Sequence, residues 1–278
     1  MAVIAGLQEF PNPAIALRRL QMNLPQELLD EILSYLPPED GQGRQSLANC
    51  SLVSKSWTNP SRRHLFKTVN ISKRSLQSWR ETISPTNYEF LQHIQALSYT
   101  TDTKDSRSGY QPPEYCIDVL QDYFPSLHQL QHLSLLSMQI PSDISLRLEI
   151  FSAFQYTLSR LSLMDRDISI GVLVTLINHF PNLDHLDLSS LRRSTDGKPT
   201  PSLSRSRMRR LHLSHLRADI LGIVDQLSEL GLAFDQVVVN DWQPVRPNVL
   251  TRIAETVGGK ARCIELLRTD RSCTCTRP

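Results

Sequence analysis

LQHLSL, residues 130 to 135, is followed along the chain by LSRLSL at 158 to 163 and LDHLDL at 183 to 188. The three stretches share the pattern L-x-x-L-x-L, and Met208, Leu211 and Leu213 repeat it with methionine in the first place. Because side chains along a strand alternate between its two faces, the last two leucines of each copy point the same way. The pattern therefore predicts a series of short strands, each with one apolar face.

Looser copies of the pattern extend the series in both directions. They are Phe66, Val69 and Ile71; Ile94, Leu97 and Tyr99; Phe234, Val237 and Val239; and Ala261, Ile264 and Leu266. The steps between the fourth positions of successive copies are 28, 36, 28, 25, 25, 26 and 27 residues, so six of the seven lie between 25 and 28. Such a period predicts an array of repeats, in which no unit closes its own apolar face and neighbours must stack.

The period falls within the range of leucine-rich repeats, in which each unit supplies one strand and one helix. Helix-like segments lie between the strands at 143–154, 168–180, 219–230 and 248–257, and polar loops are expected at 100–115 and 192–207. Typical leucine-rich repeats place Asn or Cys three residues after the last leucine. This chain has Met138, Arg166, Leu191, Leu216 and Trp242 there. We therefore expect an α/β solenoid of about eight degenerate repeats.

A different hydrophobic periodicity precedes the repeats. In LPQELLDEILSYL, residues 24 to 36, leucines and an isoleucine recur at the spacing of a helix face. Pro25 suits the first helical position, and Pro37 and Pro38 are expected to end the helix. We expect a polar loop containing Gly41 and Gly43 next, and then a second apolar stretch through Trp57 that ends near Pro60. Residues 24 to 65 thus predict a small helical unit.

This helical unit resembles the F-box motif, in which an L-P-x-E-L-x-x-x-I-x-x-x-L helix precedes a segment rich in S-L-V-x-K-x-W. The matching residues are Leu24, Pro25, Glu27, Leu28, Ile32, Leu36, Leu52, Val53, Lys55 and Trp57. The continuation RRHLFKTVNI, residues 62 to 71, is similar to fungal F-box proteins with a divergent leucine-rich array. We accordingly expect a lead segment at 1–22, an F-box at 23–65 and a degenerate leucine-rich repeat domain at 66–278.

The resemblance implies a substrate-recognition subunit of a Skp–cullin–F-box ubiquitin ligase. The F-box would bind the Skp adaptor, and through it the cullin, while the repeats would bind an unknown target protein. The candidate adaptor-binding residues, or residues that support that surface, are Leu24, Pro25, Leu28, Ile32, Leu33, Leu36, Leu47, Val53 and Trp57. The alternative is a leucine-rich scaffold outside any ligase, in which the first helices only cap the array.

Residues that flank the inward leucines are expected to line the concave face of such an array and to bind the target. The candidates are His132, Ser134, Arg160, Ser162, His185, Asp187, Arg210 and His212. The alternative is that they are only solvated strand positions. SRSRMRR, residues 204 to 210, is the most basic stretch; it is either a grip for an acidic or phosphorylated partner or a solvated, flexible loop.

Composition excludes several other classes of function. A formal net charge of +2, with 40% hydrophobic and 21% charged residues, gives no general case for nucleic acid or membrane binding. Five scattered cysteines favour a reducing compartment, so we expect an intracellular protein of the cytoplasm, the nucleus or both. The sequence contains no G-x-S-x-G, H-E-x-x-H or P-loop motif, and Cys263, Cys273 and Cys275 fall one short of a four-ligand zinc site. We therefore expect no enzymatic activity, cofactor or metal.

Overall fold

The computed structural model divides the chain into two compact units, Met1–Leu65 and Phe66–Pro278. The structure describes residues 24–37, 40–82, 88–100, 121–136, 144, 147–164, 168–189, 193–194, 201–214, 218–241, 251, 253, 255 and 261–268. None of the helices within these residues is long and apolar enough to cross a membrane.

The first unit is built from helices, namely α2 (Gln26–Ser34), α3 (Gly41–Val53) and α4 (Lys55–Leu65). Helix α4 contacts both of the others. The Asp30 carboxylate of α2 lies 3.6 Å from the Arg63 guanidinium and 3.8 Å from His64 Nε2, both on α4. Thr58 Oγ1 of α4 donates a hydrogen bond of 2.9 Å to the carbonyl oxygen of Ser51 on α3. Side-chain contacts thus tie α4 to its two neighbours.

Several helix limits differ from the expected ones. Pro25 is the N-cap residue of α2 rather than its first helical residue, and its carbonyl accepts the first backbone bonds. The second apolar stretch divides at Ser54, and α4 runs through Pro60, which is buried, to Leu65. Pro60 thus lies inside the helix, where it has no N–H to donate to the carbonyl oxygen of Ser56.

Gly41 and Gly43 begin helix α3; the expectation of a loop at these residues is wrong. Asp40 is the N-cap, and its side chain accepts a hydrogen bond of 2.5 Å from the Gly43 N–H, which satisfies one of the unpaired groups of the first turn. A Cβ added to Gly43 would lie 2.0 Å from the carbonyl oxygen of Pro37, whereas one added to Gly41 would meet nothing within 4 Å. Gly43 therefore permits a close approach of two backbone segments.

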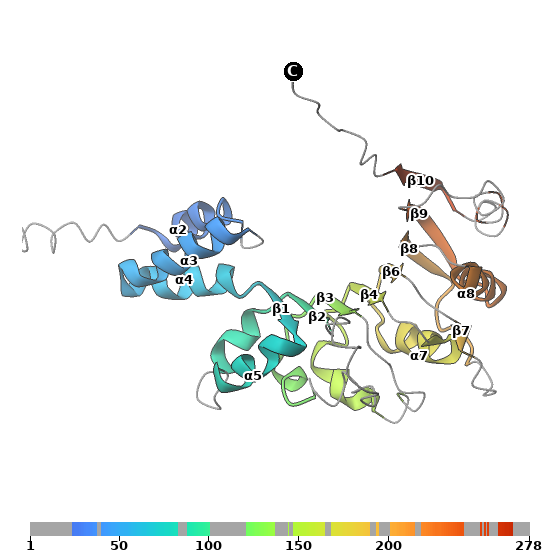
Figure 1. Cartoon of the computed structure of the whole chain (residues 1–278), viewed down its shortest axis with the longest axis horizontal. Helices are drawn as coiled ribbons and strands as arrows, with labels where there is room; N and C mark the ends of the chain where they lie inside the picture. Colours follow the sequence, from blue (N-terminus) through green and yellow to red (C-terminus); the bar gives the residue numbers. More distant parts are fainter. Residues whose placement is uncertain are drawn as a thin grey trace, which may run out of the picture. The chain divides into compact units, whose positions relative to one another are not determined.

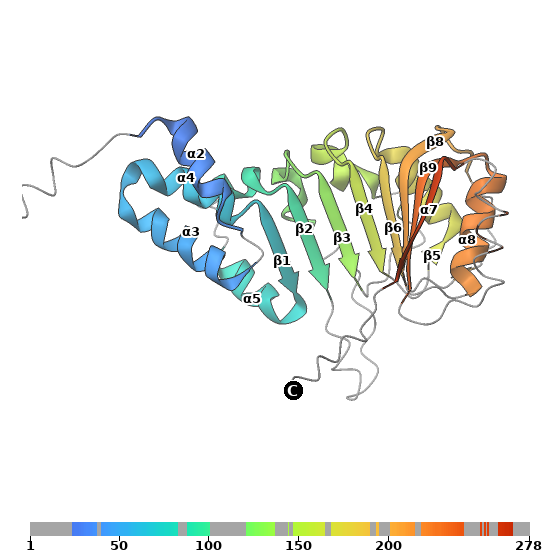
Figure 2. The ribbon, with the colours of Figure 1, turned by 90° about the horizontal axis from the view of Figure 1, so that it is seen from above.

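The second unit contains an eight-stranded sheet whose neighbouring strands are all parallel (Figure 2). In spatial order, which is also chain order, the strands are β1 (Thr68–Ser72), β2 (Ala96–Thr100), β3 (His132–Leu136), β4 (Arg160–Met164), β6 (His185–Ser189), β8 (Arg207–Ser214), β9 (Ala233–Asp241) and β10 (Cys263–Arg268). Each of the eight copies of the sequence pattern supplies one of these strands. Two short strands, β5 (Ile168–Ser169) and β7 (Arg193–Ser194), pair separately.

Helical segments of this unit lie on one side of the sheet, and α5, α7 and α8 can be followed there in Figure 1. The segments are α5 (Lys73–Thr82), η1 (Tyr88–His93), η3 (Phe124–Ser126), η5 (Leu148–Phe154), α7 (Ile170–His179) and α8 (Ala218–Glu229). The helix expected at 219–230 is confirmed by α8. The one expected at 143–154 is a 3₁₀ helix over its described part, and the segment 168–180 opens with β5 before α7. Most of 100–115 and 248–257, and the residues three after each last leucine, lie outside the described residues.

The sheet packs on the helical segments through equivalent residues of the repeats. Leu133, Leu161, Leu186 and Leu211 pair in register on successive strands, and each is at most 2% exposed. Phenylalanines from the segments beside the sheet extend this core, with ring centroids 5.4–6.0 Å apart. They are Phe124, Phe151, Phe154 and Phe180. The chain is thus a helical N-terminal region followed by an open parallel sheet with helices on one side.

The two glycines of α3 provide a matched test of this packing. Gly43→Ala should destabilise the first unit by about 1–3 kcal/mol, because the new methyl group forces apart the backbones of Pro37 and α3. Gly41→Ala should be neutral or stabilising by up to about 1 kcal/mol, since alanine restricts the unfolded chain and meets no neighbour. Urea unfolding of the full chain, with hydrogen exchange of the α2–α4 amides, measures both. Equal effects of the two substitutions would contradict the close approach at Gly43.

Candidate functional site

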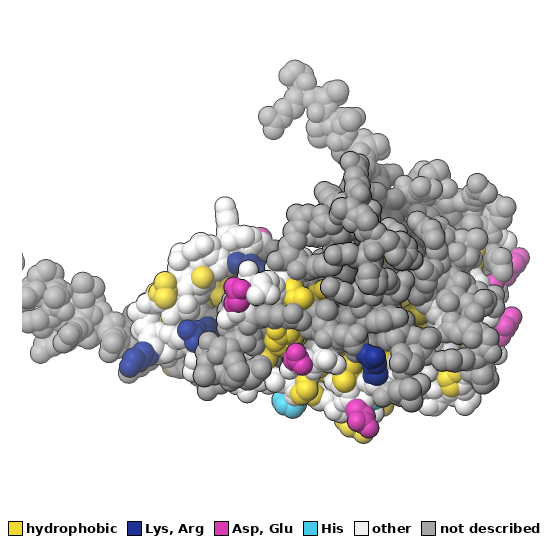
Figure 3. All heavy atoms as spheres, turned by 60° about the horizontal axis from the view of Figure 1, so that its bottom comes forward, with side chains coloured by type: hydrophobic (Ala, Val, Ile, Leu, Met, Phe, Trp, Pro, Cys, Tyr) yellow, Lys and Arg dark blue, Asp and Glu magenta, His cyan; other side chains and the backbone are white. Residues whose placement is uncertain are grey.

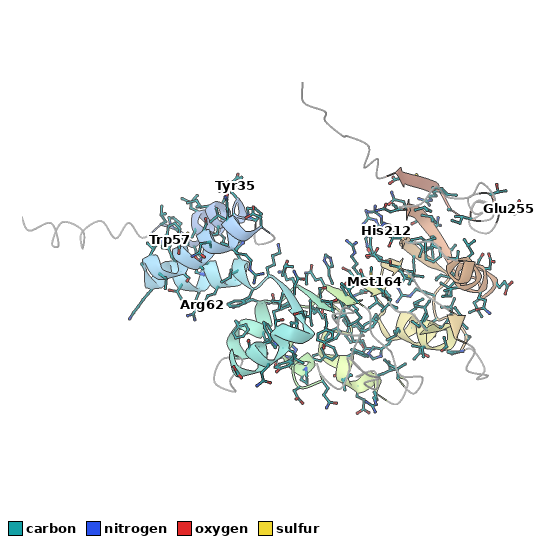
Figure 4. All side chains as sticks on the ribbon, in the orientation of Figure 1. Tyr35, Trp57, Arg62, Met164, His212 and Glu255 are labelled. Atoms are coloured by element: carbon teal, nitrogen blue, oxygen red, sulfur yellow. The ribbon has the colours of Figure 1, made fainter. Side chains whose placement is uncertain are left out.

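Helix α2 carries apolar side chains on two sides. Leu29 and Leu33 are buried inside the first unit. Leu28, Ile32 and Tyr35 remain 45%, 44% and 77% exposed. These three residues are four and three positions apart, so they lie along one side of the helix. Figure 4 shows Tyr35 at the surface of this unit. The first unit therefore uses only one apolar side of α2 for its own core.

The end of α3 exposes a second apolar group. Leu47 is buried, whereas Leu52 and Val53 are 83% and 67% exposed. Hydrophobic side chains are visible at the surface of the first unit in Figure 3. We refer to the exposed apolar residues of these two groups, namely Leu28, Ile32, Tyr35, Leu52 and Val53, as the apolar surface.

The nine candidate adaptor-binding residues divide by burial. Pro25, Leu28, Ile32 and Val53 are exposed; Leu24, Leu36 and Trp57 are half-buried; Leu33 and Leu47 are buried. The buried pair can act only as support for the surface. Tyr35 and Leu52 are exposed but absent from the candidates. Tyr35 was detectable from its position seven residues after Leu28, which places it on the same helix side.

The eight candidate target-binding residues of the second unit lie in two rows that run across its sheet. The strand register aligns His132, Arg160, His185 and Arg210, which we call the basic row. It also aligns Ser134, Ser162, Asp187 and His212, which we call the middle row. Figure 4 shows that Met164 and His212 lie on the side of the sheet opposite α7 and α8. The register therefore gathers all eight candidates on the side free of these helices.

Asp187 is the centre of a hydrogen-bonded cluster on this side. Its carboxylate accepts bonds of 2.7 Å from Arg160 Nε and 2.6 Å from Ser162 Oγ, and His212 Nδ1 lies 3.5 Å away. Burial alone would raise the pKa of Asp187. Hydrogen bonds from His212, Ser162 and Arg160, with the positive charge of Arg160, outweigh burial and lower the pKa to about 2. The carboxylate thus stays ionised and joins three neighbouring strands.

The histidines of the basic row differ in their surroundings. Burial lowers the pKa of His132, and the charges of Arg160 and His185 add to this effect against the opposing influence of Asp187 and Asp184. His132 is therefore harder to protonate than a free histidine. His185 Nδ1 lies 2.5 Å from Asp184 Oδ1, so its ring has a carboxylate partner beside it.

The SRSRMRR stretch is not a flexible loop along its whole length, and its arginines serve different roles. Arg205 donates to the carbonyl oxygens of Ile177, Phe180 and Leu183, and it thereby satisfies groups at the end of α7. Residues 207–210 belong to β8, in which Arg207 pairs with Asp235 while Arg209 is exposed. The arginines of the stretch are therefore not equivalent: Arg205 and Arg207 have partners within the chain, whereas Arg209 is exposed.

The Asp187 cluster makes a prediction about stability in acid. The folded-state pKa is depressed, so the cluster stabilises the fold above the ordinary pKa of 3.8 and loses this effect as the pH falls toward about 2. Asp187→Asn should cost about 2 kcal/mol at pH 7 and flatten the loss of stability below pH 4, as measured by denaturant unfolding. If the unfolding free energy of the variant fell with pH as steeply as that of the wild type below pH 4, the stabilising role of the Asp187 cluster would be contradicted.

The family match found among known proteins lies mainly in the first unit. No curated protein matches the chain. Residues 22–72 match the family model described as F-box-like, a range that includes α2, α3, α4 and β1. The chain therefore carries an F-box-like domain at its helical N-terminal region.

Proposed function

We propose that the protein is a substrate-recognition subunit of a Skp–cullin–F-box ubiquitin ligase. The observation that carries the proposal is the apolar surface of Leu28, Ile32, Tyr35, Leu52 and Val53 within the F-box-like domain. F-box domains typically bind Skp-type adaptors. The apolar surface would be the adaptor-binding site, and the adaptor would connect the protein to the cullin.

The energetics of the first unit support adaptor binding. A helical unit of about 40 residues lies near the lower limit for independent folding, because it can bury only a small core. A partner that covers its exposed apolar side chains would therefore stabilise it. Each such side chain contributes about 1.5–3 kcal/mol when fully buried, before the costs of association. Leu28 and Ile32 are already half covered and would contribute less, whereas Tyr35, Leu52 and Val53 have more surface to bury.

The second unit would hold the target. We infer that its eight stacked strands form a degenerate leucine-rich repeat solenoid, because each strand carries one copy of the repeat in an unchanged register. Its polar side, with the basic and middle rows, is the surface proposed for the target. The protein would act without catalytic chemistry of its own, by holding the target close to a separate ubiquitin-conjugating enzyme. Such a role lies inside the cell, in the cytoplasm, the nucleus or both.

The proposal is tested by binding of the full chain to a purified Skp-type adaptor. Leu28→Asp with Ile32→Asp should weaken this binding more than a hundredfold, because two carboxylates would have to be buried without partners. Tyr156→Asp is the matched control, since Tyr156 is a 68% exposed apolar residue of the second unit and should leave adaptor binding unchanged.

Calorimetry or surface plasmon resonance measures these affinities, and circular dichroism checks that the variants remain helical. Absence of adaptor binding by the wild-type chain, or equal binding by the double variant, would refute the ligase assignment. Either result would favour the alternative of a leucine-rich scaffold outside any ligase.

A further inference from the structure

Arg210, at the end of the basic row, has an unsatisfied guanidinium nitrogen. Its Nε atom is buried and has no hydrogen-bond partner among the described residues. Its neighbour in register, Gln236, is held toward β10, because its side-chain amide nitrogen donates a 2.6 Å hydrogen bond to Glu265. Buried donors are nearly always paired, so an unpaired charged donor on an exposed side of a sheet indicates an acceptor supplied from outside.

The acidic groups of this surface are, in contrast, already engaged. Asp187 accepts from Arg160 and Ser162 and lies beside His212. Asp184 lies beside His185, and Glu265 accepts from Gln236. The basic row itself contains no acidic residue. Around Arg210, the described part of the surface therefore offers an unmatched positive charge but no unmatched carboxylate.

The length of the basic row suits an extended segment better than a single phosphate. Its residues occur once per strand, about 4.8 Å apart, so the row extends over about 14 Å. A phosphate group is held by donors that converge on one point. An extended peptide places alternate side chains about 6.6–7 Å apart, so three successive carboxylates span a similar 13–14 Å.

We propose that the basic row binds an acidic segment of the target protein, lying extended across strands β3 to β8. Arg210 pairs with one carboxylate of the segment through its guanidinium group. His132, Arg160 and His185 line the remainder of the path. This inference rests on the proposed function in that it takes the polar side of the sheet as the target-binding surface.

The test uses the full chain and a fluorescent peptide of alternating glutamate and serine. A glutamine–serine peptide of equal length is the uncharged control. The glutamate peptide should bind, and should bind more weakly as salt is added, whereas the glutamine peptide should not bind. Arg210→Gln should weaken binding of the glutamate peptide about tenfold or more, because a charge-assisted hydrogen bond is lost. Arg210→Lys should recover part of the affinity, since it keeps the charge but not the forked geometry.

Arg209→Gln is the matched control, because Arg209 is an exposed arginine one residue away on β8. It should leave the affinity unchanged. Equal binding of the two peptides, equal losses in the Arg209 and Arg210 variants, or binding only of a phosphoserine version would overturn the proposal. Adaptor binding, measured on the same preparations, reports on the other unit, so failure of this inference and failure of the ligase assignment give different results.

Discussion

The fixed register of the parallel strands is the constraint on which the second unit depends. Leu133, Leu161, Leu186 and Leu211 lie side by side and are buried. A shift of one residue in any strand would turn its leucines away from the core and expose them, at about 1.5–3 kcal/mol for each side chain. The register that buries these leucines also places every intervening residue on the opposite side of the sheet. The leucines thus determine where the polar surface is.

This constraint explains why the strands could be predicted and the segments between them less well. Alternating leucines at a regular period leave one plausible arrangement, so strand positions and order followed from the sequence. The 3₁₀ helix at Leu148–Phe154 contains apolar residues at spacings that also suit an α-helix, so periodicity alone does not distinguish the two. The start of α3 at Gly41 was missed because glycines suggest a loop. Asp40 was the available signal, as a capping residue before the helix.

The candidate surfaces were predictable in location but not in detail. Helical spacing grouped Leu28, Leu29, Ile32 and Leu33 as one apolar face, whereas the structure buries Leu29 and Leu33 and exposes the other two. Periodicity measures only whether residues share a side, and α2 is apolar over more than one side. Likewise, the sequence placed Arg160, Ser162, Asp187 and His212 on one surface. Their convergence on the Asp187 carboxylate depends on strand neighbours and side-chain rotamers, which no spacing rule contains.

Under the proposed function, the two surfaces suit two kinds of association. The free energy gained by burying the apolar surface increases with the buried area and changes little with salt concentration. This surface therefore favours a lasting attachment to one constant partner. The polar side of the sheet has few large apolar residues, and its charges are arranged around the bonded Asp187 carboxylate. A partner there must match the positions of the remaining donors, because a poorly placed acceptor leaves Arg210 unpaired and loses its own hydration. Such a surface discriminates between partners more than it increases affinity. Attachment and discrimination would then reside in separate units, so that the target-binding residues can vary without disturbing the adaptor-binding helices.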